Sequence, residues 1–289
     1  MQVVANGIIT GLTIVVLALG FTAAYLPTRV FHLALGGIYA AAPFCAWTCL
    51  RLGWSPWFAL GLAVLAGAGL SLACEAANHA LLDRKRAPSG AHLIASLGAY
   101  IVIAQATAMI WGNEPKVLRT GVDAVTTIGG LVLTRAQLMA AAVSIGVLAI
   151  FYVWLRFSGL GLRFRALAEN SVEFALRGYN VRRLRLLAFG ISGVLCSTSS
   201  LLVANDVGFD AHGGLHATIL AVVAVIIGGR RSFYGPLVGG LLLGLVRSGA
   251  VWFFSARWQE AVTFLLLALF LFFRPSGLLG RKGRMEADV

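Results

Sequence analysis

Long apolar stretches, separated by short polar connections, follow one another along the whole chain. A helix that crosses the hydrocarbon core of a bilayer needs about 20 mostly apolar residues. The clearest stretches of that kind are residues 7–26, 33–50, 56–82, 92–111, 138–155, 184–204, 236–253 and 258–273. The pattern predicts an all-α integral membrane protein, a polytopic bundle of about eight to nine transmembrane helices.

A shorter apolar run, 216–228, lies between two of these spans. As an α-helix it would extend about 20 Å, whereas the hydrocarbon core is about 30 Å thick. It either crosses with help from the preceding Gly213-Gly214, or enters as a broken helix that is shielded by protein. Counting it as a crossing gives nine, with the N-terminus outside and the C-terminus in the cytoplasm.

The basic residues of the connections test this orientation. With nine crossings, the cytoplasmic side holds 17 of the 23 lysines and arginines, and such an excess is typical of cytoplasmic loops. The outer side keeps the remaining residues, Arg51, Lys116, Arg119, Arg135, Arg247 and Arg257. The net charge of +12 is therefore spread over short loops, and we expect no nucleic-acid partner.

Composition narrows the class of protein further. The chain is 59% hydrophobic and only 12% charged, unlike an ordinary water-soluble domain, so we interpret residues 1–289 as one transmembrane domain with the lipid bilayer as its solvent. It has no Gly-x-x-x-x-Gly-Lys-Ser/Thr phosphate loop, no HExxH element, no CxxC pair and no paired nucleophile and base. We therefore expect no catalytic residue, metal or cofactor on this chain.

Two connections are long enough to have structure of their own. The outer one, 112–137, contains two short β-prone runs around Gly129-Gly130 and predicts a small hairpin. The inner one has helical composition over 162–177, followed by Gly178 as a stop, so a cytoplasmic helix is expected at about 162–178.

The predicted inner helix presents a regular charged face. Glu169 and Glu173 would share that face, with Arg165 and Arg177 one turn beyond each. Three alanines leave its surface low in relief: Ala166, Ala168 and Ala175. The face either docks into a groove of a partner protein or is the solvated side of an amphipathic loop helix.

Polar residues within the apolar spans are costly and need their own interpretation. Glu75, Asn78 and His79 share one helix face near the inner end of the third span, where Glu75 and His79 can bond to each other or to Arg84. We interpret them as an inner-gate or packing cluster in preference to a substrate site. His212 and His216, beside Asp206 and Asp210, are expected in a capped, solvated outer loop and not at a metal.

Several motifs together carry a family resemblance. They are the stretch 165–184; Ala-Phe-Gly-Ile-Ser-Gly at 188–193; Leu-Ile-Ala-Ser-Leu-Gly at 93–98; Gly-Pro-Leu-Val-Gly-Gly-Leu-Leu-Leu-Gly at 235–244; and Phe-Arg-Pro-Ser-Gly-Leu-Leu-Gly at 273–280. With them the chain resembles the branched-chain amino acid ABC permeases, of the shorter of the two permease types. The resemblance covers nearly the whole chain.

This resemblance implies a half-channel in a bacterial inner membrane. It would pair with a second, related permease, bind two cytosolic ATPases that hold the ATP and magnesium, and receive substrate from a periplasmic solute-binding protein. The resemblance also assigns the helix that contacts an ATPase. Its candidate coupling residues are Arg165, Ala166, Glu169, Glu173, Ala175, Arg177 and Gly178.

One departure from the family pattern leaves the substrate open. Relatives commonly carry an Asn-Phe-Ala-His-Gly-Glu-like element where this chain has His32-Leu-Ala-Leu-Gly-Gly-Ile-Tyr39. Branched-chain amino acids, other small amino acids and amides such as urea all remain candidates. A small zwitterion would be met by helix ends and backbone groups at breaks in the helices. The candidate path residues are His32, Gly36, Gly37, Tyr39, Gly213 and Gly214.

Two other classes of protein compete with this interpretation. An ion-coupled secondary transporter or channel would need ionisable residues at mid-membrane depth, and only the Glu75 group comes close. An intramembrane enzyme would need a nucleophile and a base at depth, which the sequence does not offer. Neither explains the basic inner helix.

Overall fold

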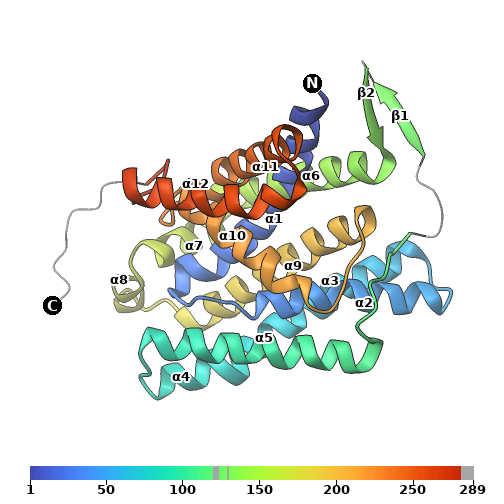
Figure 1. Cartoon of the computed structure of the whole chain (residues 1–289). Coiled ribbons are helices and arrows are strands. Elements are labelled where there is room, and N and C mark those ends of the chain that lie inside the picture. Colours follow the sequence, from blue (N-terminus) through green and yellow to red (C-terminus); the bar gives the residue numbers. More distant parts are fainter. Residues whose placement is uncertain (120–123, 129, 281–289) are drawn as a thin grey trace.

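The computed structural model of the chain describes residues 1–119, 124–128 and 130–280. It is a bundle of helices with one small two-stranded sheet (Figure 1). The elements are α1 (Gln2–Thr28), α2 (Leu35–Arg51), α3 (Pro56–Cys74), η1 (Glu75–His79), α4 (Ala80–Arg84), α5 (Ser89–Trp111), β1 (Val125–Ile128), β2 (Leu131–Thr134), α6 (Arg135–Phe157), α7 (Gly159–Glu169), α8 (Ser171–Leu176), α9 (Val181–Asp206), α10 (Gly213–Gly228), α11 (Gly235–Phe253), η2 (Ala256–Trp258) and α12 (Gln259–Phe273).

Seven helices of the described part are long and apolar enough to cross a membrane. One of them is the continuous run Pro56–Arg84, in which η1 is a π-helical turn between α3 and α4. Two further helices, α2 with 17 residues and α10 with 16, are shorter. The prediction of a mostly helical, multi-span membrane protein is therefore confirmed.

The first helix, α1, runs through the centre of the bundle. It packs against α11, α9, α10 and α6, and residues on all of its faces are buried. A helix that is apolar all round fits such a central position. By contrast, α5 and α12 leave large apolar side chains such as Ile110 and Phe272 exposed, as expected for helices that face lipid.

Glycines allow the helices around α1 to approach closely. A Cβ atom on Gly244 of α11 would overlap the backbone of Gly11 in α1, and one on Gly239 would overlap Ala224 of α10. A Cβ atom on Gly240 would lie 2.6 Å from the side chain of Val15 in α1. Close backbone approach at small residues is a principal source of helix association in membranes, where lipid removes the hydrophobic driving force.

Contacts between segments show which connections share an end of the bundle. At one end the Gln2 side chain bonds to Val132 of the hairpin at 2.8 and 2.9 Å, and His212 approaches Asn113. At the other end Arg29 donates to the carbonyl of Ala168 at 3.1 Å. Figure 1 shows the hairpin and α8 at opposite ends of the molecule.

The helix α10 runs between these two ends. His212, just before its first residue, lies by Asn113 at the hairpin end, whereas its last carbonyls accept from Leu278 and Leu279 near the C-terminus, at 2.8 and 2.9 Å. The apolar run 216–228 is therefore lengthened by one turn that begins at the Gly213-Gly214 pair.

The predicted outer hairpin is present. Strands β1 and β2 pair antiparallel, with Val125 opposite Thr134 and Ile128 opposite Leu131. A capping box at Thr134 and Gln137 then starts α6 directly after β2.

The prediction of one continuous inner helix at 162–177 is wrong. The chain forms two helices, α7 and α8, with Asn170 between them in an extended conformation (φ −147°). The Asn170 side chain accepts from the backbone N–H groups of Val172 and Glu173, each at 3.1 Å, so it caps α8 and ends the regular run of α7. The predicted stop at Gly178 is confirmed by its left-handed φ of 81°.

We expect Gly244→Ala to destabilise the protein by about 1–3 kcal/mol, because the added methyl group forces α1 and α11 apart. Gly249→Ala, on the same helix, is the matched control, since a Cβ there would meet nothing within 4 Å. Thermal unfolding in detergent measures the difference. Equal melting temperatures for the two variants would show that the glycine contact does not hold the bundle together.

Candidate functional site

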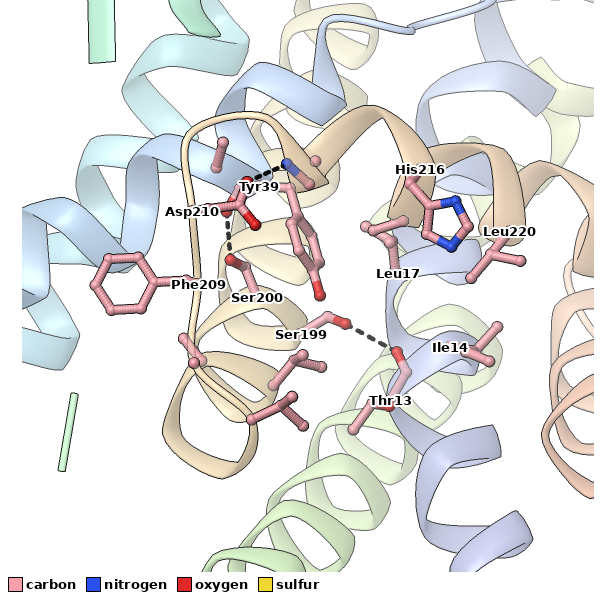
Figure 2. Close-up of a pocket in the computed structure, with 18 of the residues that line it drawn as sticks. Thr13, Ile14, Leu17, Tyr39, Ser199, Ser200, Phe209, Asp210, His216 and Leu220 are labelled. Carbon is pink, nitrogen blue, oxygen red and sulfur yellow. Dashed lines mark hydrogen bonds between the residues drawn. The ribbon is translucent and has the colours of Figure 1, made fainter. Parts of the chain in front are cut away.

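A cavity of about 430 Å³ opens between α1, α2, α9 and α10, next to the loop 207–212 (Figure 2). Part of its wall is aliphatic and comes mainly from α1 and α10. Those residues are Ile14, Leu17, Ala217 and Leu220. The volume lies within the range of small-molecule sites in proteins.

Hydroxyl groups line the opposite wall and join three helices. Ser199 of α9 donates to the carbonyl of Thr13 in α1 at 2.8 Å, and Ser200 donates to the carbonyl of Tyr39 in α2. These bonds tie α9 to both neighbours at the depth of the cavity. The phenol of Tyr39 points into the open space towards Ser199 in Figure 2.

Asp210 lies at the start of α10 on the rim of the cavity. One carboxylate oxygen accepts from the backbone N–H groups of His212 and Gly213, at 2.7 and 2.6 Å. A carboxylate at this position is stabilised by the positive end of the helix dipole. The rim therefore holds a fixed negative charge beside Gly213 and Gly214.

The rim also holds a second group of charged residues, which was not predicted from the sequence. Arg247 of α11 donates to Glu260 and to Thr263 of α12, at 3.1 Å each, and the Glu260 oxygen that receives it also lies 3.2 Å from Nε2 of His216. Arg247 is only 9% exposed. Its place inside the apolar run 236–253 was the available signal, because an ionisable residue within a span needs a partner.

The predicted surroundings of the outer histidines are corrected in part. His212 meets Asp210 through its own backbone and Asn113 through its ring, as a capped loop residue would. His216, however, lies in α10 and pairs with Glu260 of α12. Among the described residues no group of three or more histidine, cysteine or acidic side chains could hold a metal ion.

The six predicted path residues do not lie together. Tyr39, Gly213 and Gly214 line the cavity. Gly36 lies behind it, where a Cβ on Gly214 would overlap the Gly36 carbonyl, so this pair sets the close approach of α2 and α10. Gly37 faces Ile103 of α5 instead.

His32 lies away from the cavity, in the connection between α1 and α2. It is fully buried, 3.3 Å from the hydroxyl of Ser71, and its ring packs on those of His79 and Phe189. Burial, and secondarily the neighbouring His79, lower the pKa of His32 well below its usual value, so its ring is neutral. Its contacts make it a packing residue between the helices that carry Ser71, His79 and Phe189.

The inner polar cluster forms with a different partner than the sequence suggested. Glu75 is 3% exposed and pairs with Arg185 of α9 at 2.8 and 3.2 Å, whereas His79 or Arg84 was expected. Asn78 donates to the carbonyl of Ala95 at 2.9 Å, and His79 approaches His92 at 3.3 Å. The cluster joins η1, α5 and α9, as a packing cluster does.

The candidate coupling residues lie on the exposed surface of α7 and α8 and the turn that follows. Glu173 and Arg177 form an ion pair at 2.9 Å. A surface groove of about 380 Å³ follows the break between the two helices. Four of the predicted residues line it: Ala166, Glu169, Glu173 and Arg177. Arg165, Ala175 and Gly178 lie exposed outside the groove.

The helical fold and its cavity indicate the class of protein. A multi-span helical bundle that encloses a partly polar, partly apolar cavity is the architecture of membrane transport proteins. The comparison with known proteins then gives the family. Residues 3–271 match the family described as "Branched-chain amino acid transport system / permease component", and the chain belongs to this family of permeases.

Individual relatives match over almost their full length. The branched-chain amino acid permease protein BraD of Pseudomonas aeruginosa is 28% identical, over 97% of this chain and 96% of its own length. LivH of Escherichia coli K12, a permease protein of the same kind of system, is 24% identical, with the same coverage. A chain in the structure of PsaBC from Streptococcus pneumoniae in complex with Fab shares the fold, with a TM-score of 0.52 at 12% identity, over 96% of this chain and 93% of that one.

Proposed function

We propose that this permease imports branched-chain or closely related aliphatic amino acids. The observation that carries the proposal is the cavity, whose wall of Ile14, Leu17 and Leu220 suits an aliphatic side chain. The charged rim around Asp210 and Arg247 suits the two charges of an amino acid. The names of BraD and LivH, which describe branched-chain amino acid transport, support the same substrate class.

The permease works as part of an ABC importer. A second, related permease completes the translocation path, two cytosolic ATPases supply the energy, and a periplasmic solute-binding protein delivers the substrate. The exposed groove along α7 and α8 supports an ATPase contact, because it offers charged and small residues on a surface that no described part of the chain covers. This chain contributes no ATPase site of its own.

The chain crosses a bacterial inner membrane nine times, with the N-terminus outside. The short helices α2 and α10 count as crossings, which the contacts of α10 at both ends of the bundle support. The connections at the end that holds α7 and α8 carry most of the basic residues, as cytoplasmic loops do. The hairpin then lies at the periplasmic surface.

This topology predicts opposite accessibility for two cysteines introduced one at a time into a chain without its four native cysteines. A cysteine at Thr127 of β1 should react with a membrane-impermeant maleimide in cells whose outer membrane is permeabilised. One at Ser171 of α8 should react only after the inner membrane is opened. Labelling at Ser171 in sealed cells would reverse the orientation.

The proposed coupling predicts ATP-dependent leucine uptake into proteoliposomes that contain this chain, its partner permease, the ATPases and the binding protein. Glu169→Arg should lower uptake and ATPase association about tenfold or more, because it reverses a charge in the groove. Glu114→Arg, an exposed carboxylate at the opposite end of the bundle, is the control. Uptake by this chain alone, driven by an ion gradient, would instead establish a secondary transporter.

The proposed path predicts that filling the cavity blocks transport without dismantling the complex. Ala217→Phe places an aromatic ring in the aliphatic wall and should reduce leucine uptake about tenfold or more. Ala261→Phe, on the exposed face of α12, should leave uptake unchanged. Copurification of the ATPases checks assembly. Normal uptake by Ala217→Phe would place the path elsewhere.

A further inference from the structure

The side chain of Arg185 is held by two carboxylates of a segment far away in the sequence. Its Nε and Nη2 donate to the two oxygens of Glu75, and its Nη1 meets the carboxylate of Asp83. The Glu75 side chain is 4% exposed and that of Arg185 15%. Each nitrogen of the guanidinium therefore has a carboxylate partner, in a geometry that favours strong, charge-assisted bonds.

We call the bonds of Arg185 to Glu75 and Asp83 the clamp. The contacts of Asp83 extend this clamp into a third helix. The other oxygen of Asp83 lies 3.3 Å from Nε2 of His92 in α5, and His92 approaches His79 of η1. Asn78 adds a bond to the carbonyl of Ala95. Arg185 thus holds the start of α9 against the inner ends of α3, α4 and α5 together.

An apolar cluster holds the same turn of α9 to the segment α7–α8. Leu184, the residue before Arg185, packs with Leu167 of α7 and Phe174 of α8 in one buried group. The start of α9 is fixed by the Asn180 side chain, which accepts from the N–H of Arg183 at 3.1 Å. Within one turn of α9, Leu184 therefore contacts the candidate coupling segment, α7–α8, and Arg185 contacts the segment that runs from α3 to α5.

The segment that Arg185 grips contains the π-helical turn η1. Such turns are rare, interrupt the regular ladder of a helix and are frequently found at functional sites. Glu75 is the first residue of this turn, and Asp83 lies in α4, directly after it. The clamp therefore spans the one irregular turn within the run Pro56–Arg84.

We propose that Arg185 transmits the movement of α7–α8 to the inner ends of α3, α4 and α5. This inference rests on the proposed function, because it takes an ATPase as the source of the movement. A shift of Leu167 and Phe174 moves Leu184, and Arg185 moves the two carboxylates with it. Because separating a buried pair leaves an uncompensated charge, the clamp stays closed during the movement and acts as a rigid link.

The same helix leads from the clamp to the cavity. Farther along α9, Ser199 and Ser200 bond to α1 and α2 at the cavity wall. Arg185 is thus a positioning residue: it determines whether α3–α5 move together with α9, while the hydroxyls pass the movement of α9 to the cavity.

The test uses the complete transporter in proteoliposomes and measures leucine uptake and ATP hydrolysis in the same sample. We expect Arg185→Met to lower the uptake per ATP hydrolysed by about tenfold or more, with ATP hydrolysis nearly unchanged. Arg183→Met, an exposed arginine on the same turn of α9, should keep the wild-type ratio. An unchanged ratio in Arg185→Met would overturn the inference.

A second variant distinguishes a role of Arg185 in transmitting movement from a role in the stability of the fold. Arg185→Met leaves Glu75 buried without its partner and lowers thermal stability, whereas Arg185→Met combined with Glu75→Met removes both charges and should restore much of that stability. We expect the double variant to keep the low ratio of uptake to hydrolysis. If the ratio recovers with the melting temperature, Arg185 is only a structural residue.

Uptake by the wild-type transporter distinguishes a failure of the proposed function from a failure of the role of Arg185. Absence of ATP-dependent leucine uptake by the wild-type complex contradicts the proposed function, and this inference with it. Normal wild-type uptake with an unchanged ratio in Arg185→Met contradicts the role of Arg185 alone.

Discussion

The close packing of α1 against its neighbours is the constraint on which the rest of the structure depends. In a bilayer, helices gain little by hiding apolar side chains from one another, so association relies on the fit of their surfaces. Gly11 and Gly244 let the backbones of α1 and α11 touch, and Gly240 does the same beside Val15. This fixes α1 at the centre, and with it the wall of the cavity that Thr13, Ile14 and Leu17 form.

Two largely buried arginines, Arg185 and Arg247, lie at the two ends of the bundle, and each is paired with a carboxylate on another helix. Arg185 holds Glu75 at the end of α7 and α8, and Arg247 holds Glu260 at the opposite end. An unpaired charge at either place would be costly in a low-dielectric setting, so each pair fixes which helices adjoin. The group around Arg247 borders the cavity, whereas the group around Arg185 lies next to the segment formed by α7 and α8. The two groups therefore connect helices at opposite ends of the bundle.

Some predictions from sequence succeeded because they rest on local rules. The long apolar helices, the hairpin around Gly129-Gly130 and the stop at Gly178 each follow from the types of residue within one short window. The continuous inner helix failed for a local reason as well: the side chain of Asn170 competes for backbone N–H groups and starts a new helix. The partners of Arg185 and Arg247 could not be predicted from the sequence, since they lie on other helices.

By itself the sequence determined that this chain is a helical membrane protein with several spans and which permease family it resembles. The length of an apolar stretch is a property of consecutive residues, so it can be found in the sequence without a structure. Only the tertiary structure decided that Tyr39, Gly213 and Gly214 meet in a cavity while His32 does not, and that Glu75 pairs with a residue 110 positions away. Such contacts depend on how helices pack side by side, and the order of residues in each helix leaves that packing open.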